Sequence, residues 1–239
     1  MCFPSEEGLG PRIENLRARV RNSAVRAGRD AERVRIVGVA KKHPVAVIEE
    51  ALSHGFYDIG ENFVQEWQSK AKALEDPRLR WHFVGRLQTN KARFLVGNSA
   101  LIHSVDRLKL LDTIARLARE QDVVQDILIQ VGVAGEQQKA GVSVEELADF
   151  YARALELDSV RVCGLMIFPP AVTDPEDARP CFRRGAELLE ELRRMTPSNR
   201  DLPTELSMGM SHDFEIAVEE GATLIRLGTA IFGPRPGST

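Results

Sequence analysis

Short apolar runs alternate with longer amphipathic segments along most of the chain. The apolar runs are rich in β-branched residues and carry few polar positions, which is typical of strands buried on both faces of a parallel sheet. The amphipathic segments repeat their apolar residues at helical spacing. We therefore expect eight strands, over residues 34–40, 57–61, 81–85, 101–105, 126–133, 160–167, 204–209 and 223–228.

Helices are predicted between these strands and before the first one. The leading helix covers residues 11–28, and the others cover 45–55, 63–74, 89–97, 106–121, 143–157, 176–195 and 212–221. Eight such units favour an α/β fold closed into a (β/α)8 TIM barrel, with the last helix short or replaced by the leading one. No change of composition marks a linker, so we expect residues 1–239 to form a single domain.

The composition is that of a globular protein, with 43% hydrophobic and 28% charged residues. A net charge of −3 gives no general basic field, so nucleic acid is not favoured as a partner. No run approaches the ~18 apolar residues of a membrane span, and the opening "MCFPSEEGLG" lacks the order of a signal peptide. The three cysteines form no CxxC pair. These features predict a cytoplasmic protein without a membrane partner.

The first predicted strand ends in two lysines, in the stretch "RIVGVAKKHP". Charged residues often mark the point where a strand reaches solvent, which is the structural interpretation. The functional interpretation is that Lys41 or Lys42 is a reactive amine at the mouth of the barrel, where active sites of this fold lie. Because both faces of the strand are apolar, the alternation alone does not choose between the two lysines.

The last predicted strand contains an arginine, in "TLIRLGTAIFG". A buried guanidinium is costly unless a partner satisfies it, so Arg226 either pairs with a carboxylate such as Glu61 or binds a ligand. Gly228 and Thr229 follow directly, and "SMGMSH" after the seventh strand adds Ser211 and another glycine. These two loops are a recurrent phosphate site in TIM barrels. A lysine facing a phosphate cradle is the arrangement that pyridoxal 5′-phosphate requires.

Several motifs occur in an order that resembles one known family. They are "VGVAKKHP", "DIGENFVQE", "WHFVGRLQTNK", "IHSVD" and "LSMGMSHDFEIAVEEGATLIRLGTAIFG". The chain is similar, over nearly its whole length, to the pyridoxal phosphate homeostasis proteins of the YggS/PROSC type, which are related to the barrel domain of alanine racemase. The resemblance implies a cofactor-binding barrel that is active in vitamin B6 homeostasis. Such a barrel would hold pyridoxal phosphate and either buffer it or pass it to apo-enzymes that use it, and the absence of a second domain favours a monomer.

The resemblance also assigns roles to particular residues. It implies that Lys41 forms the internal aldimine, a Schiff base with the cofactor, and that Asn62 lies near the cofactor ring. It implies that Arg226 faces the pyridine nitrogen. The phosphate would be held by Ser211, Gly228 and Thr229. The chain departs from the usual family pattern beside the lysine and after the third strand, at Ala40, Lys42, His43, Arg86 and Thr89.

Two functions remain open for such a barrel. An arginine at the ring nitrogen cannot supply the proton of a pyridinium, which makes the cofactor a weak electron sink and suits carriage or racemase-like chemistry. Racemases of the alanine racemase type add a second domain and a catalytic tyrosine, whereas Tyr57 and Tyr151 are predicted at a strand start and in a helix. We therefore expect a non-catalytic carrier, with an amino-acid racemase as the alternative. The spacing of the histidines predicts no metal site.

Overall fold

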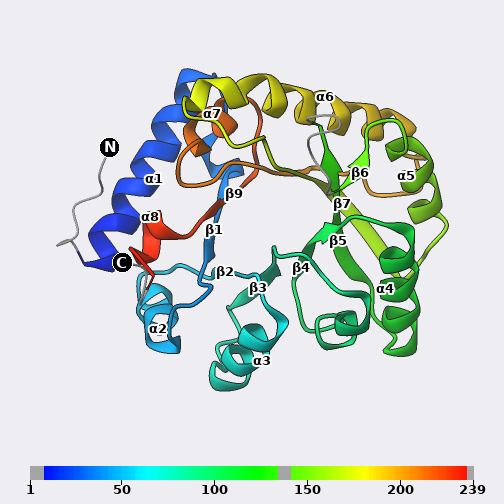
Figure 1. Cartoon of the computed structure of the whole chain (residues 1–239), viewed down its shortest axis with the longest axis horizontal. Coiled ribbons are helices and arrows are strands. Elements are labelled where there is room, and N and C mark those ends of the chain that lie inside the picture. The colour runs from blue at the N-terminus through cyan, green and yellow to red at the C-terminus, as the bar shows by residue number, and fades with distance from the viewer. Residues whose placement is uncertain (1–7, 134–140, 236–239) are drawn as a thin grey trace.

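The strands close into a barrel of parallel strands (Figure 1). The computed structural model describes residues 8–133 and 141–235. The barrel order is β4-β3-β2-β1-β9-β8-β7-β5, and a β4–β5 pairing closes it. Its strands are β1 (Arg35–Val39), β2 (Asp58–Glu61), β3 (Arg80–Phe83), β4 (Leu101–Val105), β5 (Gln125–Gly132), β7 (Val160–Ile167), β8 (Glu205–Ser207) and β9 (Leu224–Leu227). The predicted (β/α)8 barrel is confirmed.

The helices lie around the outside of this ring (Figure 1). They are α1 (Leu9–Arg26), α2 (Val45–Ser53), α3 (Val64–Ala73), α4 (Leu108–Glu120), α5 (Leu147–Leu155), α6 (Arg179–Met195), α7 (Phe214–Glu219) and the short α8 (Thr229–Phe232). The described residues also form the 3-10 helices η1 (Ala31–Arg33), η2 (Thr89–Phe94) and η4 (Pro175–Ala178). As predicted, the last helix is short, and the leading helix α1 packs beside it. No helix of the described chain has the length and apolarity needed to cross a membrane.

The elements differ from the expectations in three details. Residues 89–97 do not form an α-helix, because only the 3-10 turns of η2 form before Gly97, whose φ of 76° ends the segment. A further strand, β6 (Val142–Ser143), pairs with the end of β5. It is too short to produce a recognisable alternation. Helix α6 begins at Arg179, later than expected, with Pro180 in its first turn, where a proline needs no amide donor.

The apolar side chains form two cores. The larger one lies between the strands and the helices. The smaller one fills the inside of the barrel and consists of Val37, Val39, Val84, Leu101, Leu128, Met166 and Leu224. Residues two apart in β1 and β9 therefore point inward, as the two-residue repeat of a strand requires. This alternation decides which side chains reach the barrel axis.

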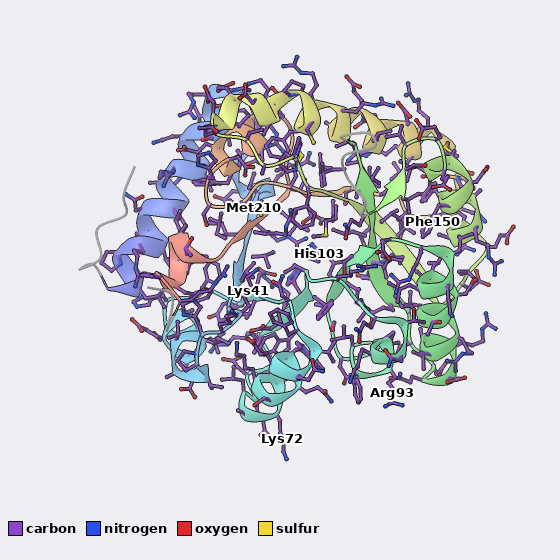
Figure 2. The ribbon with its side chains drawn as sticks, in the orientation of Figure 1. Lys41, Lys72, Arg93, His103, Phe150 and Met210 are labelled. Atoms are coloured by element: carbon purple, nitrogen blue, oxygen red, sulfur yellow. The ribbon has the colours of Figure 1, made fainter. Side chains whose placement is uncertain are left out.

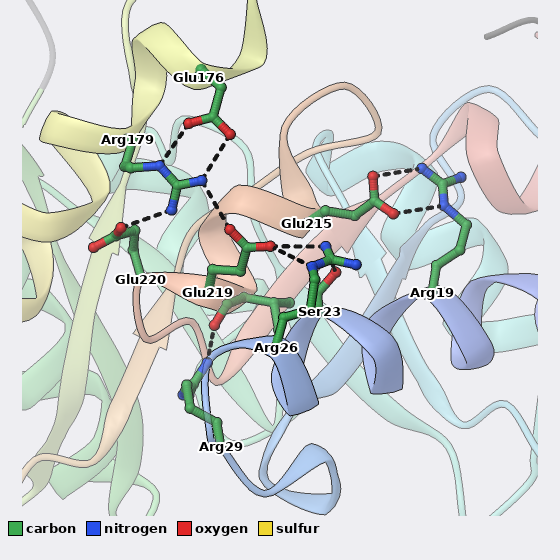
Figure 3. Close-up of polar contacts among 10 residues, drawn as sticks. Arg19, Ser23, Arg26, Arg29, Glu176, Arg179, Glu215, Glu219 and Glu220 are labelled. Carbon is green, nitrogen blue, oxygen red and sulfur yellow. Dashed lines mark hydrogen bonds and ion pairs between the residues drawn. The ribbon is translucent and has the colours of Figure 1, made fainter.

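Ion pairs fasten the leading helix to the end of the barrel fold (Figure 3). Arg19 of α1 makes two hydrogen bonds to Glu215 of α7, at 3.1 and 3.2 Å. Arg26 of α1 lies 2.8 Å from Glu219, which also accepts from Arg179 at 2.9 Å. The network thus joins α1 to α6 and α7, which lie near the other end of the chain. It holds α1 over the part of the ring that the short α8 leaves uncovered.

Candidate functional site

The residues singled out in the sequence follow the carboxyl ends of different strands. Since the barrel strands are all parallel, these ends lie at one mouth of the barrel. Lys41 follows β1, Asn62 follows β2, Ser211 follows β8, and Gly228 and Thr229 follow β9. Figure 2 shows Lys41 inside the ring of strands, whereas Lys72 points away from it.

Lys41 and Lys42 lie in different environments. Val37 and Val39 point into the barrel, and Lys41 follows the same alternation. Lys41 is half-buried, whereas Lys42 is exposed and adopts a φ of 64°. Burial lowers the pKa of the Lys41 ammonium group, and the positive charge of Arg235 adds to the effect. A larger share of Lys41 is therefore the unprotonated amine, the form that attacks a carbonyl carbon.

A second, buried lysine supports the turn that carries Lys41. The Nζ atom of Lys70 donates to the carbonyl oxygen of Ala40 at 2.7 Å and to Glu61 Oε1 at 2.6 Å. Glu66 also accepts from Lys70, at 3.4 Å, and from the backbone N–H of Lys42, at 2.7 Å. The sequence interpretation did not include Lys70. It ties α3 and β2 to the residue directly before Lys41.

Arg226 is buried inside the barrel with neutral partners. Its side chain donates to Ser207 Oγ at 2.8 Å and to the carbonyl oxygen of Ile167 at 3.0 Å. The guanidinium carbon lies 4.4 Å from the centroid of the Phe168 ring. Among the described residues no carboxylate lies within 4.0 Å of it, and Glu61 pairs with Lys70. The alternative in which Arg226 pairs with a carboxylate such as Glu61 is therefore wrong.

The charge state of Arg226 follows from its burial. Removal from water lowers the pKa of Arg226 to about 10, although the negative charge of Asp213 acts in the opposite direction. The group still carries its proton at neutral pH, so it acts only as a hydrogen-bond donor. A guanidinium has five N–H groups, and two bonds use only part of that capacity. The remaining N–H groups make no hydrogen bond to the described residues.

The loops after β8 and β9 meet at two hydroxyl groups. Thr229 Oγ1 lies 3.4 Å from Ser211 Oγ. Gly228 lies beside β1, because a Cβ placed there would be 3.4 Å from the carbonyl oxygen of Val39. Gly209 adopts a φ of 88°, and a Cβ there would lie 2.6 Å from Ala217. Glycine is therefore required where the first loop turns. Thr229 donates to Ser211 here, and each hydroxyl has one rotatable O–H that can turn to donate to an anion instead.

Asn62 has a buried acceptor that lacks a partner. Its Oδ1 atom makes no hydrogen bond within the described residues. Gly85 lies against it, since a Cβ there would be 2.1 Å from the backbone oxygen of Asn62. Both residues line a groove of about 690 Å³ that Lys41 and Arg226 do not line. An unpaired buried acceptor is costly, so this atom favours a ligand that donates to it.

The comparisons with known proteins agree with this barrel. The family model of the alanine racemase N-terminal domain matches residues 12–236. A pyridoxal phosphate homeostasis protein of Aquifex aeolicus is 48% identical over 224 residues, covering 94% of this chain and 97% of the relative. One of Pseudomonas aeruginosa is 38% identical over 227 residues, covering 95% of this chain and 96% of the relative.

A solved structure gives the same result. PipY of Synechococcus elongatus, solved with PLP bound, superimposes with a TM-score of 0.83 at 36% identity. The match covers 95% of this chain and 100% of PipY. The chain therefore belongs to the alanine racemase N-terminal domain family, and within that family to the pyridoxal phosphate homeostasis proteins.

Proposed function

We propose that this chain binds pyridoxal 5′-phosphate at the mouth of its barrel and serves in the homeostasis of that cofactor, without a strong catalytic activity of its own. The names of its relatives and the PLP bound to PipY support the proposal. The observation that carries it is Arg226, a buried cation with neutral partners and spare donors. Asn62 Oδ1 also lacks a hydrogen-bond partner among the described residues, but the groove that Asn62 lines includes neither Lys41 nor Arg226.

Each residue has a role in this proposal. When bound, pyridoxal phosphate supplies an aldehyde that reacts with an amine and a ring that withdraws electrons. Lys41 would supply the amine that condenses with that aldehyde, with release of water. The hydroxyls of Ser211 and Thr229 donate to the phosphate, which the small Gly228 admits close to the backbone. Asn62 lies beside the ring.

Arg226 favours carriage over catalysis. It donates a hydrogen bond to the ring nitrogen and, being a cation at neutral pH, does not protonate it. A ring nitrogen without its proton withdraws electrons weakly, so the site is poorly suited to breaking bonds at an amino-acid carbon. Transfer of the cofactor to apo-enzymes is the proposed use of the bound pool. The monomeric state and the cytoplasmic location stay predictions.

The racemase alternative requires a second proton-transfer group at the mouth. The sequence has two tyrosines, and both are described. Tyr57 precedes β2 at the opposite end of the barrel, and its hydroxyl bonds to Arg78 at 2.9 Å. Tyr151 lies in α5, and its hydroxyl bonds to Thr196 at 2.8 Å. Neither tyrosine reaches the mouth, which favours the carrier.

The test combines loading, transfer and turnover on one preparation. Protein loaded with pyridoxal phosphate and then dialysed should stay yellow and lose its colour on borohydride reduction. Mixed with an apo-enzyme that needs the cofactor, it should restore that enzyme's activity, and with L-alanine it should leave the optical rotation unchanged. A preparation that cannot be loaded contradicts the proposal, and racemisation at an enzymatic rate selects the alternative.

A further inference from the structure

A continuous chain of buried hydrogen bonds leads away from Arg226 across the barrel. Ser207 Oγ, which accepts from Arg226 at 2.8 Å, lies 2.9 Å from His103 Nδ1. His103 Nε2 lies 2.9 Å from His82 Nδ1, and His82 Nε2 lies 2.9 Å from Asp58 Oδ1. The chain therefore crosses from β9 through β8, β4 and β3 to β2. All five side chains are buried, and Figure 2 shows His103 inside the ring of strands.

The far end of the chain is a carboxylate. Burial alone would raise the pKa of Asp58, but the hydrogen bonds from Arg80 and His82 outweigh it and hold that pKa below its ordinary value. Arg80 donates a hydrogen bond to each carboxylate oxygen of Asp58, at 2.8 and 2.5 Å. Asp58 is thus an anion at neutral pH and can only accept hydrogen bonds. His82 must therefore carry its proton on Nε2.

The remaining donors follow from that assignment. Burial lowers the pKa values of His82 and His103, and the charges that face the pair are Asp58, Arg80, Arg35 and Arg226. Both rings are therefore neutral, with one N–H each. His82 Nδ1 must accept from His103 Nε2–H, and His103 Nδ1 must accept from the hydroxyl of Ser207. Every proton in the chain points toward Asp58.

This direction leaves a lone pair of Ser207 Oγ for Arg226. A hydroxyl that donates becomes a better acceptor, so the Asp58 charge strengthens the Arg226–Ser207 bond through the chain. A second bond to Ile167 and the stacking on Phe168 fix the plane of the guanidinium. Buried charged groups are often no more stabilising than apolar side chains of similar volume, so stability alone does not explain this chain.

We propose that Asp58, His82, His103 and Ser207 are positioning residues, which hold Arg226 in the orientation in which it donates to the ring nitrogen of pyridoxal phosphate. The inference rests on the proposed function, because it needs the cofactor at this mouth. The His82 end of the chain reaches a cavity of about 400 Å³ at the amino ends of the strands, which Arg80 also lines. The orientation of Arg226 is therefore set from the end of the barrel opposite the mouth.

The first test uses the protein without added cofactor. Long-range ¹H–¹⁵N spectra report the tautomer of each histidine, and His82→Phe and His103→Phe variants assign the signals. Both rings should be neutral at pH 7 and protonated on Nε2. An Nδ1–H tautomer of either ring, or a charged His103, would break the donor order and overturn the inference.

The second test measures the hydrogen bond from Arg226 to the ring nitrogen of the bound cofactor. Ser207→Ala removes the link between His103 and Arg226, and Ser159→Ala is the control, since Ser159 is a buried serine whose hydroxyl donates to Ala115 at 2.7 Å. With pyridoxal phosphate labelled at the ring nitrogen, Ser207→Ala should move the ¹⁵N signal toward that of a pyridine without a hydrogen bond. The affinity should fall on the order of tenfold, the value of one charged hydrogen bond. The control should change neither quantity.

The outcomes separate the inference from the function on which it rests. A Ser207→Ala protein that folds, is still trapped on Lys41 by borohydride and keeps the parental ¹⁵N signal would overturn the positioning role and leave the proposed function standing. A parent protein that binds no pyridoxal phosphate would remove both. A variant that restores the hydroxyl, Ser207→Thr, should recover the parental signal if the hydroxyl itself positions Arg226.

Discussion

The ammonium nitrogen of Lys70 lies 2.7 Å from the carbonyl oxygen of Ala40, the residue directly before Lys41. Its other close partner is Glu61, whose side chain is fully buried. Lys70→Met should lower the free energy of unfolding by about 3–5 kcal/mol, because it leaves a buried carboxylate without its cation. Urea unfolding measures the change. Lys72→Met, on the exposed face of the same helix, should stay within ~0.5 kcal/mol of the parent.

A double variant separates the two consequences of that substitution. Adding Glu61→Gln to Lys70→Met removes the unpaired charge, so part of the lost stability should return, while the anchor on Ala40 stays absent. Burial raises the pKa of Glu61. In the single variant, stability should therefore rise as the pH falls and Glu61 takes up a proton. Equal stability of Lys70→Met and Lys72→Met would show that Lys70 is not an anchor.

The reaction of Lys41 should depend on pH. Burial and the charge of Arg235 lower its pKa, so the reactive amine becomes available at a lower pH than in an ordinary lysine. The rate of loading with pyridoxal phosphate should rise with pH, with a midpoint below that of a free lysine amide treated in the same way. Because the cofactor's own ionisations affect both reactions equally, the comparison isolates the contribution of the lysine amine. Coincident midpoints would mean that the site does not alter this amine.

The hydroxyls of Ser211 and Thr229 should act on the phosphate alone. Ser211→Ala with Thr229→Val removes two donors, which should weaken pyridoxal phosphate binding by roughly tenfold or more and leave pyridoxal unchanged. Equilibrium titrations with the two ligands give the ratio. Thr113→Val is a matched control, since its hydroxyl bonds within α4 to Lys109. An equal loss of affinity for pyridoxal phosphate and pyridoxal would show that these hydroxyls do not contact the phosphate.

The ion-pair network around Arg179 should stabilise the attachment of α1. Arg179 pairs with Glu176, Glu219 and Glu220, and Glu219 also receives Arg26 (Figure 3). Arg179→Ala should cost about 1–2 kcal/mol, less at high salt, because networks exceed single exposed pairs. Arg184→Ala, a helix-surface pair on α6, is the comparison. Thermal unfolding at two salt concentrations measures the stability of both variants. An equal loss of stability in the two variants, with the same salt dependence, would contradict the network.

The barrel could be predicted from the sequence because each strand and helix carries its own periodic signal. That signal is absent from two kinds of element. Strand β6 has two residues, which is too few to show an alternation. The composition of η2 is compatible with an α-helix, but the segment forms only a short 3-10 helix. The positions of the mouth residues followed from topology, since parallel strands bring their carboxyl ends together.

The supporting residues of the site could not be found by their motifs. A signal for Lys70 existed, because Val64, Trp67 and Lys70 lie three apart and share the buried face of α3. A lysine is rarely buried, so the helix pattern alone favoured an exposed side chain. His82 and His103 were recognised as strand residues without metal spacing, but their hydrogen bond joins neighbouring strands and depends on register. Sequence spacing carries no information about that contact.

We expect Lys41 to be the amine that binds pyridoxal phosphate covalently. Lys42 follows it directly but is exposed, with its backbone N–H bonded to Glu66. Lys41→Ala should abolish covalent trapping and keep part of the non-covalent affinity, because Arg226 and the phosphate loops remain. Lys42→Ala should trap the cofactor as the parent does.

The most direct measurement is a peptide map of the parent protein after loading and borohydride reduction. The reduced pyridoxyl group changes the mass of the modified residue, and fragmentation of the peptide "VGVAKKHP" distinguishes its two adjacent lysines. We expect the group on Lys41 at one equivalent per chain. A modification on Lys42, or no modification of either lysine, would contradict it.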